Sequence, residues 1–386
     1  MKRGTWKSMA VLGLLLICTL TSVGEATGRV RIESTYENWR YDIPGEEESI
    51  LEEYTTRLSL GYAITRALSV QVATGIVRAQ WDYPRDGEAG LLELGGLTDT
   101  RARVTYRIGN SFMLRVGYNG PTGITELSTD EEFPVARALS SRILAFRSNR
   151  VGQGSNVDLG VSYAVKAGPA AIGLGAGYQS KGGYTLTESG GRLEPGDRIS
   201  LAGGMDVGNT NWLWRNNFRA VLYGEESYEG AAYFEHGDRY GVQTLLMRRW
   251  PRMSVWGSVN YTTYGLARRA AVDSLGAGPE LRTEEERTRG DEIYGDLGVR
   301  RILSSRLVLT LQAGLRVFPG NELDQEEARR YDFGMTTHWR LSRIFSIDLG
   351  GRYGFGELMQ LFPELGNRAG SELAGFALEG ALIIDF

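Results

Sequence analysis

Five arginines have the spacing expected for one shared face of neighbouring β-strands. Arg101, Arg103 and Arg107 lie two and four positions apart, and Arg57 and Arg115 belong to the adjacent predicted strands. Because side chains alternate between the two faces of a strand, we expect these guanidinium groups to point to one side. There they could form a positive stripe that attracts anions. Further arginines predicted on that side are Arg215, Arg219, Arg300, Arg316, Arg340 and Arg352.

Ion pairing is the alternative for these arginines. Acids recur on the same predicted face, where they could pair with the arginines and hold the strands together. These acids are Asp158, Asp206, Asp296, Asp332, Asp348 and Glu379. The sequence leaves both interpretations open.

Residues suited to enzymatic chemistry are few. The chain has two histidines, His236 and His338. His236 stands near Glu235 and Asp238, which leaves a membrane-embedded hydrolase or a metal site as an open alternative, although no second histidine or serine motif accompanies it. The run 173–177 is not a phosphate-binding loop, because no Lys-Ser or Lys-Thr follows its glycines. We therefore predict no enzymatic activity, no cofactor and no metal.

Alternating segments fill the chain from about Val30 to its end. In one of them, Val157, Leu159 and Val161 alternate with Asp158 and Gly160. In water, so many apolar faces would need a second apolar layer, and the opposite faces are polar or glycine. Lipid outside and a wet interior inside would satisfy both faces. A large soluble β-sandwich or propeller is the alternative.

Short and long connections alternate between these segments. No apolar run reaches 18 residues, so a membrane could be crossed only by a closed barrel. The predicted fold is all-β: a transmembrane antiparallel up-and-down β-barrel of about sixteen strands, within a range of 12 to 18, with short periplasmic turns and long extracellular loops. The long connections are predicted at 42–53, 82–94, 120–151, 180–196, 224–231, 266–291, 319–329 and 357–371.

The last segment keeps one apolar face to its final residue. Phe376, Leu382, Ile384 and Phe386 occupy alternate positions on that face. Chain ends usually fray in water, so an aromatic terminus is better suited to a strand that seals a barrel in lipid. The ending also resembles the closing-strand signal of bacterial outer-membrane proteins. It predicts that the barrel-assembly machinery of the outer membrane is a partner.

The first 26 residues have the layout of a cleavable secretory signal peptide. Lys2, Arg3 and Lys7 precede an apolar run over 9–20, and a small-residue cleavage site ends at Ala26. We predict a single barrel domain over 27–386. Removal of the signal changes the formal net charge from −4 to −6, and an acidic chain without a basic run is a poor nucleic-acid binder.

The connection 120–151 contains a short amphipathic pattern within 133–146. Polar and acidic residues at 129–132 are suited to a helix start. We expect either a helix that folds into the pore and narrows it, or a surface helix that lies over the rim. The residues predicted near one helical face are Val135, Leu139, Arg142, Ile143 and Phe146.

Five short motifs occur in order between residues 94 and 184: Gly96-Leu97-Thr98-Asp99-Thr100, Tyr106-Arg107-Ile108, Pro121-Thr122-Gly123, Val151-Gly152-Gln153-Gly154-Ser155 and Asp158-Leu159-Gly160. In these motifs the chain resembles the outer-membrane barrels associated with phenol and other aromatic degradation pathways, which are distant relatives of FadL-type channels. The resemblance implies uptake of small, often hydrophobic compounds. Strand character begins directly after the signal, so an exit route that depends on an N-terminal plug is not implied.

The expected function is passive diffusion or uptake of small solutes, hydrophobic, aromatic or anionic, through a barrel in the outer membrane of a Gram-negative-type cell. The alternative is a closed envelope-structural or adhesin-like barrel without transport. Outer-membrane lipid and lipopolysaccharide are the expected surroundings, because the acidic runs in the long loops could bind them through divalent cations. The sequence does not fix the solute or the oligomeric state.

Overall fold

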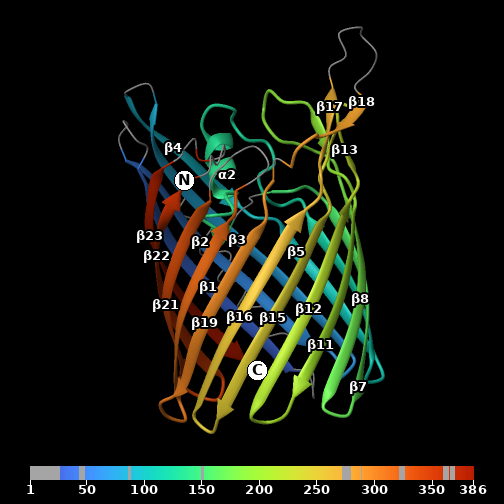
Figure 1. Cartoon of the computed structure of the whole chain (residues 1–386), viewed down its shortest axis with the longest axis vertical. Coiled ribbons are helices and arrows are strands. Elements are labelled where there is room, and N and C mark those ends of the chain that lie inside the picture. Colours follow the sequence, from blue (N-terminus) through green and yellow to red (C-terminus); the bar gives the residue numbers. More distant parts are fainter. Residues whose placement is uncertain are drawn as a thin grey trace.

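The computed structural model describes residues 27–42, 48–85, 88–148, 152–271, 280–287, 289–320, 327–359, 365 and 370–386, and the predicted signal peptide 1–26 lies outside them. The described strands close into one antiparallel barrel (Figure 1). Its strands are β1 (Thr27–Tyr41), β2 (Ser49–Ala63), β3 (Leu68–Arg85), β4 (Glu88–Leu97), β5 (Thr100–Ile108), β6 (Phe112–Gly120), β7 (Asn156–Ala167), β8 (Ala170–Lys181), β11 (Arg198–Gly208), β12 (Trp212–Tyr223), β15 (Arg239–Trp250), β16 (Met253–Tyr264), β19 (Glu292–Ile302), β20 (Leu307–Phe318), β21 (Ala328–Arg340), β22 (Phe345–Leu358) and β23 (Ser371–Asp385).

β4 and β5 share one position in the wall. β3 pairs with β5 from Leu68 to Ala73 and with β4 from Ile76 to Arg85. The two short strands are separated only by Thr98 and Asp99. The barrel therefore has 16 strand positions, which confirms the prediction of about sixteen strands.

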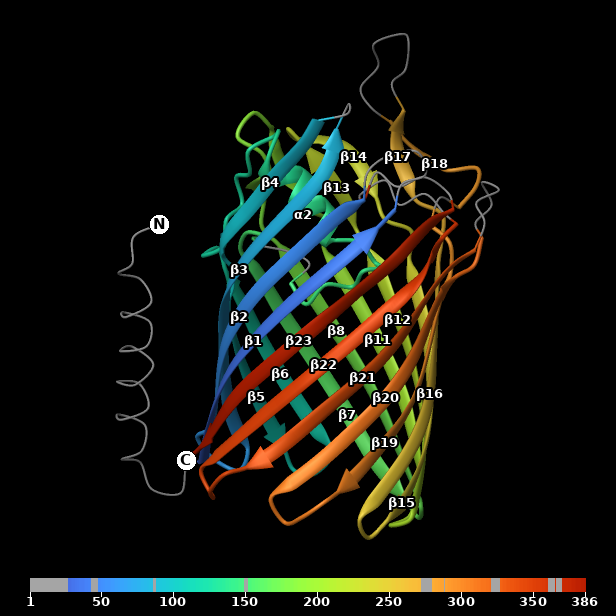
Figure 2. The ribbon, with the colours of Figure 1, turned by 90° about the vertical axis from the view of Figure 1, so that its left-hand side faces the viewer.

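The first and last strands close the barrel. β1 and β23 pair antiparallel from Arg29 opposite Asp385 to Tyr41 opposite Leu373, and they lie side by side in Figure 2. Gly28 and Phe386 exchange backbone hydrogen bonds of 2.6 and 2.9 Å at the end of this pairing. Closure leaves the wall without a free edge over this length, as a sheet in hydrocarbon requires.

The strand alternation places apolar side chains on the outside of the barrel. On β7, Val157, Leu159, Val161 and Tyr163 are 38–50% exposed. They point away from the interior, because Asp158 and Gly160 alternate with them in the same strand. Large exposed apolar side chains recur around the wall, which is unusual for a surface in water and typical of one that contacts lipid.

The two ends of the barrel differ in the length of their connections. Short turns join the strands at one end, and longer connections join them at the other (Figure 1). The predicted long loop 82–94 is wrong. β3 and β4 pair as far as Arg85 opposite Glu88, so only two residues separate them. The polar and glycine residues that suggested a loop belong partly to these extended strands.

A second sheet of six short strands stands at the long-loop end. Its order is β18-β17-β14-β13-β10-β9, and all of its strands except β14 form within connections predicted only as loops. Among the described residues, no helix is long and apolar enough to cross a membrane. The six strands are β9 (Tyr184–Thr185), β10 (Arg192–Glu194), β13 (Glu225–Tyr228), β14 (Ala231–Glu235), β17 (Arg268–Ala271) and β18 (Glu280–Thr283).

Candidate functional site: the barrel interior

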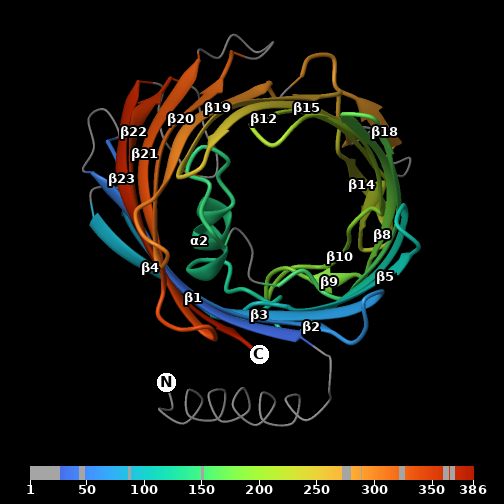
Figure 3. The same ribbon diagram turned by 90° about the horizontal axis from the view of Figure 1, so that it is seen from below.

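The connection between β6 and β7 folds into the barrel. Its helix α2 (Glu132–Leu139) lies within the ring of strands in Figure 3 and packs against β3 and β4. Ser128 and Glu132 start the helix by exchanging hydrogen bonds of 3.0 Å between each side chain and the other residue's backbone N–H. The hydroxyl of Ser128 thereby satisfies one of the backbone donors that a helix start leaves free. We call residues 132–148 the inner segment.

The helix is shorter than the amphipathic pattern predicted. It ends at Leu139, so Arg142, Ile143 and Phe146 lie in turns rather than on a helical face. Ala145 has a φ of 50°, a left-handed conformation that a continuing helix cannot contain. The apolar spacing reflects contact with the wall and not helix periodicity alone.

Apolar contacts seat the inner segment on one side of the barrel. Val135, Leu139 and Ile143 are 0–1% exposed, and Phe146 is 5% exposed. They belong to one core with inward-facing wall residues from strands at both ends of the chain: Trp39, Leu51, Val77, Trp81, Leu94, Phe318, Leu358 and Leu373. The core fills this side of the interior with protein.

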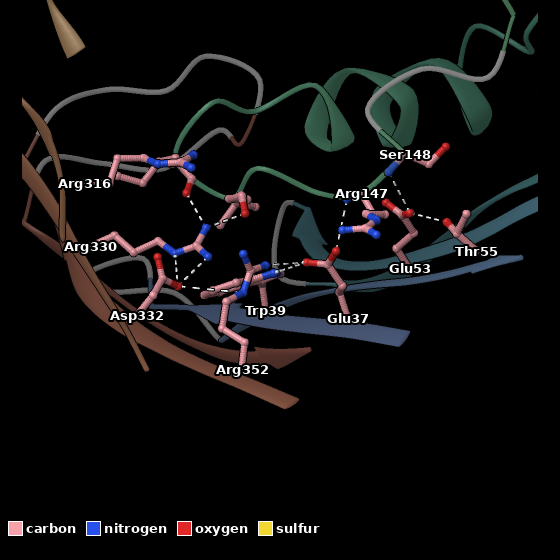
Figure 4. A network of polar contacts seen from close by, with 12 residues as sticks. Glu37, Trp39, Glu53, Thr55, Arg147, Ser148, Arg316, Arg330, Asp332 and Arg352 are labelled. Carbon is pink, nitrogen blue, oxygen red and sulfur yellow. Dashed lines mark hydrogen bonds and ion pairs between the residues drawn. The ribbon is translucent and has the colours of Figure 1, made fainter. Parts of the chain in front are cut away.

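Arg330 on β21 holds the backbone of the inner segment. Its side chain is fully buried. It donates a 2.6 Å hydrogen bond to the carbonyl of Ile143 and a second bond to the carbonyl of Leu144 (Figure 4). It is also bound to Asp332 at 2.6 and 3.0 Å and lies 3.9 Å above the ring of Trp39. One arginine thus connects the wall, the apolar core and two consecutive peptide groups.

Two buried carboxylates hold the end of the same segment. Glu37 on β1 and Glu53 on β2 are opposite each other in the strand pairing. Glu37 accepts a hydrogen bond from the backbone N–H of Arg147, and Glu53 accepts one from Ser148, both at 3.0 Å (Figure 4). Arg57, one of the five predicted path arginines, donates to the carbonyl of Arg147. Its guanidinium therefore anchors the inner segment.

Asp99, in the interruption between β4 and β5, joins both ends of the connection. One carboxylate oxygen accepts the N–H of Gly123 at 3.0 Å, and the other accepts the N–H of Gln153 and the amide of Asn119, both at 2.7 Å. Gly152 passes so close to the chain that a Cβ there would stand 2.4 Å from the carbonyl oxygen of Ile124. Several motifs that carried the sequence resemblance thus meet around Asp99. Val151 lies outside the described residues.

Ion pairs recur on the side that carries the inner segment. Glu33 binds Arg31 at 2.9 Å, and Arg352 binds Glu37 at 3.1 Å. Further pairs among the described residues here are Arg31–Asp348, Arg142–Glu292, Arg147–Glu33 and Arg330–Asp332. Among the described residues, no carboxylate forms an ion pair with Arg300, Arg316 or Arg340, so ion pairing accounts for only part of the charge on this side.

The opposite side of the barrel is predominantly basic. Arg101, Arg103, Arg107 and Arg115 face the interior and are exposed, as the strand registers and burial show. Asp158 and Asp206 are the acidic residues on the inward faces of β5–β8, β11, β12 and β15. The further basic residues on these faces are Lys166, Lys181, Arg198, Arg215, Arg219, Arg239 and Arg249. We call this surface the basic wall.

Carboxylate partners are scarce on the basic wall. Arg215 binds Asp206 through two hydrogen bonds of 2.6 and 2.8 Å. Within the described part of the chain, no carboxylate forms an ion pair with the guanidinium groups at positions 101, 103, 107, 115, 198, 219 and 239. The sequence had not singled out Arg198 and Arg239. They stand at strand starts, each two positions before an inward-facing residue, Ser200 or Gly241. This spacing of two was the signal that could have identified them.

Small inward-facing residues line the middle of the basic wall, and we call this surface the floor. On β7, β8 and β11 the inward positions include Gly160, Gly173, Gly175, Gly177 and Ala202. These positions carry at most a methyl group, so the interior is widest there for a given barrel radius. Arginines from β5 and β6 stand on one side of this floor, and arginines from β11, β12 and β15 stand on the other. The arrangement provides a lined path opposite the inner segment.

Each of the two histidines contacts one carboxylate. His338 shares a 2.7 Å hydrogen bond with Asp348. His236 lies 3.4 Å from Glu226, between the rings of Tyr223 and Phe234. Among the described residues, no group of three or more His, Cys, Asp and Glu side chains is arranged to hold a metal ion.

Comparison with known proteins identifies similar folds. No protein-family model and no curated protein matches the chain. Among solved structures it is similar to Acinetobacter baumannii OccAB1, at 9% identity and a TM-score of 0.47 over 94% of this chain and 97% of that one. An anion-selective porin from Comamonas acidovorans has 11% identity and a TM-score of 0.44, over 94% and 100% of the two chains. A Pseudomonas aeruginosa FadL homologue has 8% identity and a TM-score of 0.43, over 94% and 90%.

At such identities the likeness concerns the fold alone. The class that the fold and its interior define is a closed β-barrel of 16 strands with an apolar outside and a charged inside.

Proposed function

We propose that the protein is a channel for small solutes in the outer membrane of a Gram-negative-type cell, and that it favours anions. The basic wall is the observation that carries this proposal. Its arginines are exposed or half-buried, face a floor of small residues, and lack carboxylate ion pairs within the described residues, except for Arg215. Charges of one sign along a confined path attract counter-ions and raise their local concentration.

The outer surface supports a location in a membrane. Exposed apolar side chains surround the wall, and closure satisfies the backbone groups that hydrocarbon would otherwise leave unpaired. Export by a cleaved signal peptide, insertion by the barrel-assembly machinery and contact with lipopolysaccharide belong to the same proposal. The long-loop end would face the outside of the cell, as in other barrels of this kind.

Reversal potentials in planar bilayers under a KCl gradient test the proposal. We expect discrete conductance steps and a preference for chloride over potassium. The double variant Arg103→Gln with Arg115→Gln should lose a large part of that preference, because two charges leave the path. Arg343→Gln, which removes an exposed charge from a short turn, is the matched control and should leave the preference unchanged.

Two results would contradict the proposal. A barrel that inserts without conductance steps would be a sealed structural barrel, and a cation preference would refute the role of the basic wall.

Liposome swelling with sugars, organic acids and phenols then gives the solute range. The sequence resemblance favours aromatic compounds, whereas the basic wall favours those that carry a negative charge.

A further inference from the structure

Four arginines of the basic wall stand around its floor. The strand registers place Arg115, Gly160, Gly177, Ser200, Val221 and Arg239 in one row, each residue opposite the next. Arg115 and Arg239 therefore stand at the two ends of a row whose first middle members are small. Arg198 and Arg219 belong to the adjacent rows on the same face, two residues from Ser200 and from Val221.

The floor lets these side chains approach one another. The guanidinium of Arg115 lies across Gly160, where an added Cβ would stand 3.4 Å from its Nε and Nη2. From the other side, Arg219 on β12 and Arg239 on β15 lie on neighbouring strands, two residues apart in register. Side chains from β6, β11, β12 and β15 thus direct positive charge at one region of the path. We call these four residues the arginine cluster.

The cluster has no internal way to remove its repulsion. Arginine stays protonated at any physiological pH, so the charges persist. Within the described residues none of the four forms an ion pair with a carboxylate. A like-charge group of this kind is stabilised by an anion that binds between its members, and the planar guanidinium donates paired hydrogen bonds to carboxylate, phosphate or sulfate oxygens.

We propose that the arginine cluster is a binding site for small oxyanions that carry two negative charges, such as hydrogenphosphate, sulfate or a short dicarboxylate. The inference rests on the proposed channel and names the class of solute for which the path has a specific binding site. Two charges match guanidinium groups that reach the ligand from both sides of the floor. Ser200, on the floor between them, presents a hydroxyl to the same space. Passage of such ions should be saturable, whereas chloride should pass without saturation.

Chloride current through single channels tests the site. Sulfate, hydrogenphosphate and succinate are added separately, and each should reduce the chloride current along a saturating curve. Arg219→Gln should raise the half-blocking concentration at least tenfold, because it removes a charged donor pair, and Arg219→Lys should have an intermediate effect. Arg249→Gln, on the same wall but outside the cluster, should retain the block. If Arg219→Gln does not fold, Arg239→Gln tests the same site.

Direct binding separates the failure of the site from the failure of the channel. Calorimetry of sulfate with the detergent-solubilised protein should show one saturable site that Arg219→Gln weakens. An anion-selective channel without block and without calorimetric binding overturns the site and leaves the channel intact. Binding without any conductance supports the site and overturns the channel. Block by succinate but not by sulfate or phosphate would restrict the ligand to dicarboxylates, and block by phosphate and sulfate alone would restrict it to tetrahedral oxyanions.

Discussion

Arg330→Met should release the inner segment from the wall. The substitution keeps an unbranched side chain of similar length and removes the charge. It deletes both hydrogen bonds to the carbonyls of Ile143 and Leu144 and the contact with Trp39. It also leaves the buried carboxylate of Asp332 with Arg352 alone, whose Nε is 3.9 Å away.

The magnitude follows from burial. Removing one partner of a buried ion pair costs about 3–5 kcal/mol, because the remaining charge loses its compensation. If that cost falls on the seated state, the ratio of seated to released inner segment falls by a factor of roughly one hundred to several thousand, at about 1.4 kcal/mol per tenfold change. The wall itself should persist, because its strand pairing does not pass through Arg330's side chain.

Single-channel recording checks this prediction. The variant should show a larger conductance, or transitions to a larger level, that approaches the level of a variant lacking residues 133–146. Arg300→Met is the control, since Arg300 also faces the interior but is exposed and does not contact the inner segment. A correctly folded Arg330→Met barrel with the parent conductance and noise would refute the anchoring role.

Three further predictions concern the ends of elements. Asp99→Asn should raise current noise and the rate of proteolysis between β6 and β7, by weakening a junction worth about 1.5–3 kcal/mol per charged hydrogen bond; Asp130→Asn, on the exposed part of that connection, should change neither. Deletion of Phe386 should lower the fraction of heat-resistant folded barrel in cells more than it lowers refolding in detergent, if the residue acts as an assembly signal; equal losses would favour a purely structural role. The hydroxyl of Tyr178 and a backbone N–H hold the pKa of Asp197 below its ordinary value. This contact therefore stabilises the loops above about pH 3.9, and the stabilisation is lost as the pH falls through the lower folded-state pKa. Hydrogen exchange in these loops should accelerate only in acid, and Asp197→Asn should abolish that dependence on pH.

The wall could be predicted from the sequence because its two environments impose a period of two. Outward residues such as Leu159 and inward residues such as Gly160 alternate in every long strand, and each side has its own chemistry. The connections between the alternating segments then gave the number of strands in the wall. This signal is local, so it needs no knowledge of which distant strands become neighbours.

The second sheet left no comparable signal. β9 has two residues and β10 has three, too few to show alternation. These strands are set by pairing between connections far apart in sequence. The extension of β3 to Arg85 was missed for the opposite reason, because loop-forming residue types continue inside a paired strand.

The inner segment shows what an apolar pattern does and does not specify. The spacing of Val135, Leu139, Ile143 and Phe146 indicated a common buried side, and all four residues are buried. It did not specify the backbone, because Arg330 and the two buried glutamates bind the peptide groups of residues 143–148 in turns. Those partners come from β1, β2 and β21, which only the closed barrel brings together.

The roles of individual arginines also depended on this arrangement. Arg57 and Arg115 are both inward-facing and looked equivalent in the sequence. Arg57 lies beside the inner segment and binds its backbone, whereas Arg115 lies over the floor on the other side. Which arginines become anchors is decided by where the connection docks.

The glycines of the floor leave the protein room to diverge. A Cβ at Gly173 or Gly175 would find no atom closer than 3.5 Å, and at Gly160 it would meet only a movable side chain at 3.4 Å. Mutation at these codons can therefore add bulk, an amide or an acid to the conduit while the hydrogen-bonded ladder outside it is inherited unchanged. Under the proposed function, single substitutions at these positions would change which solutes pass through the interior, in related proteins as in engineered variants.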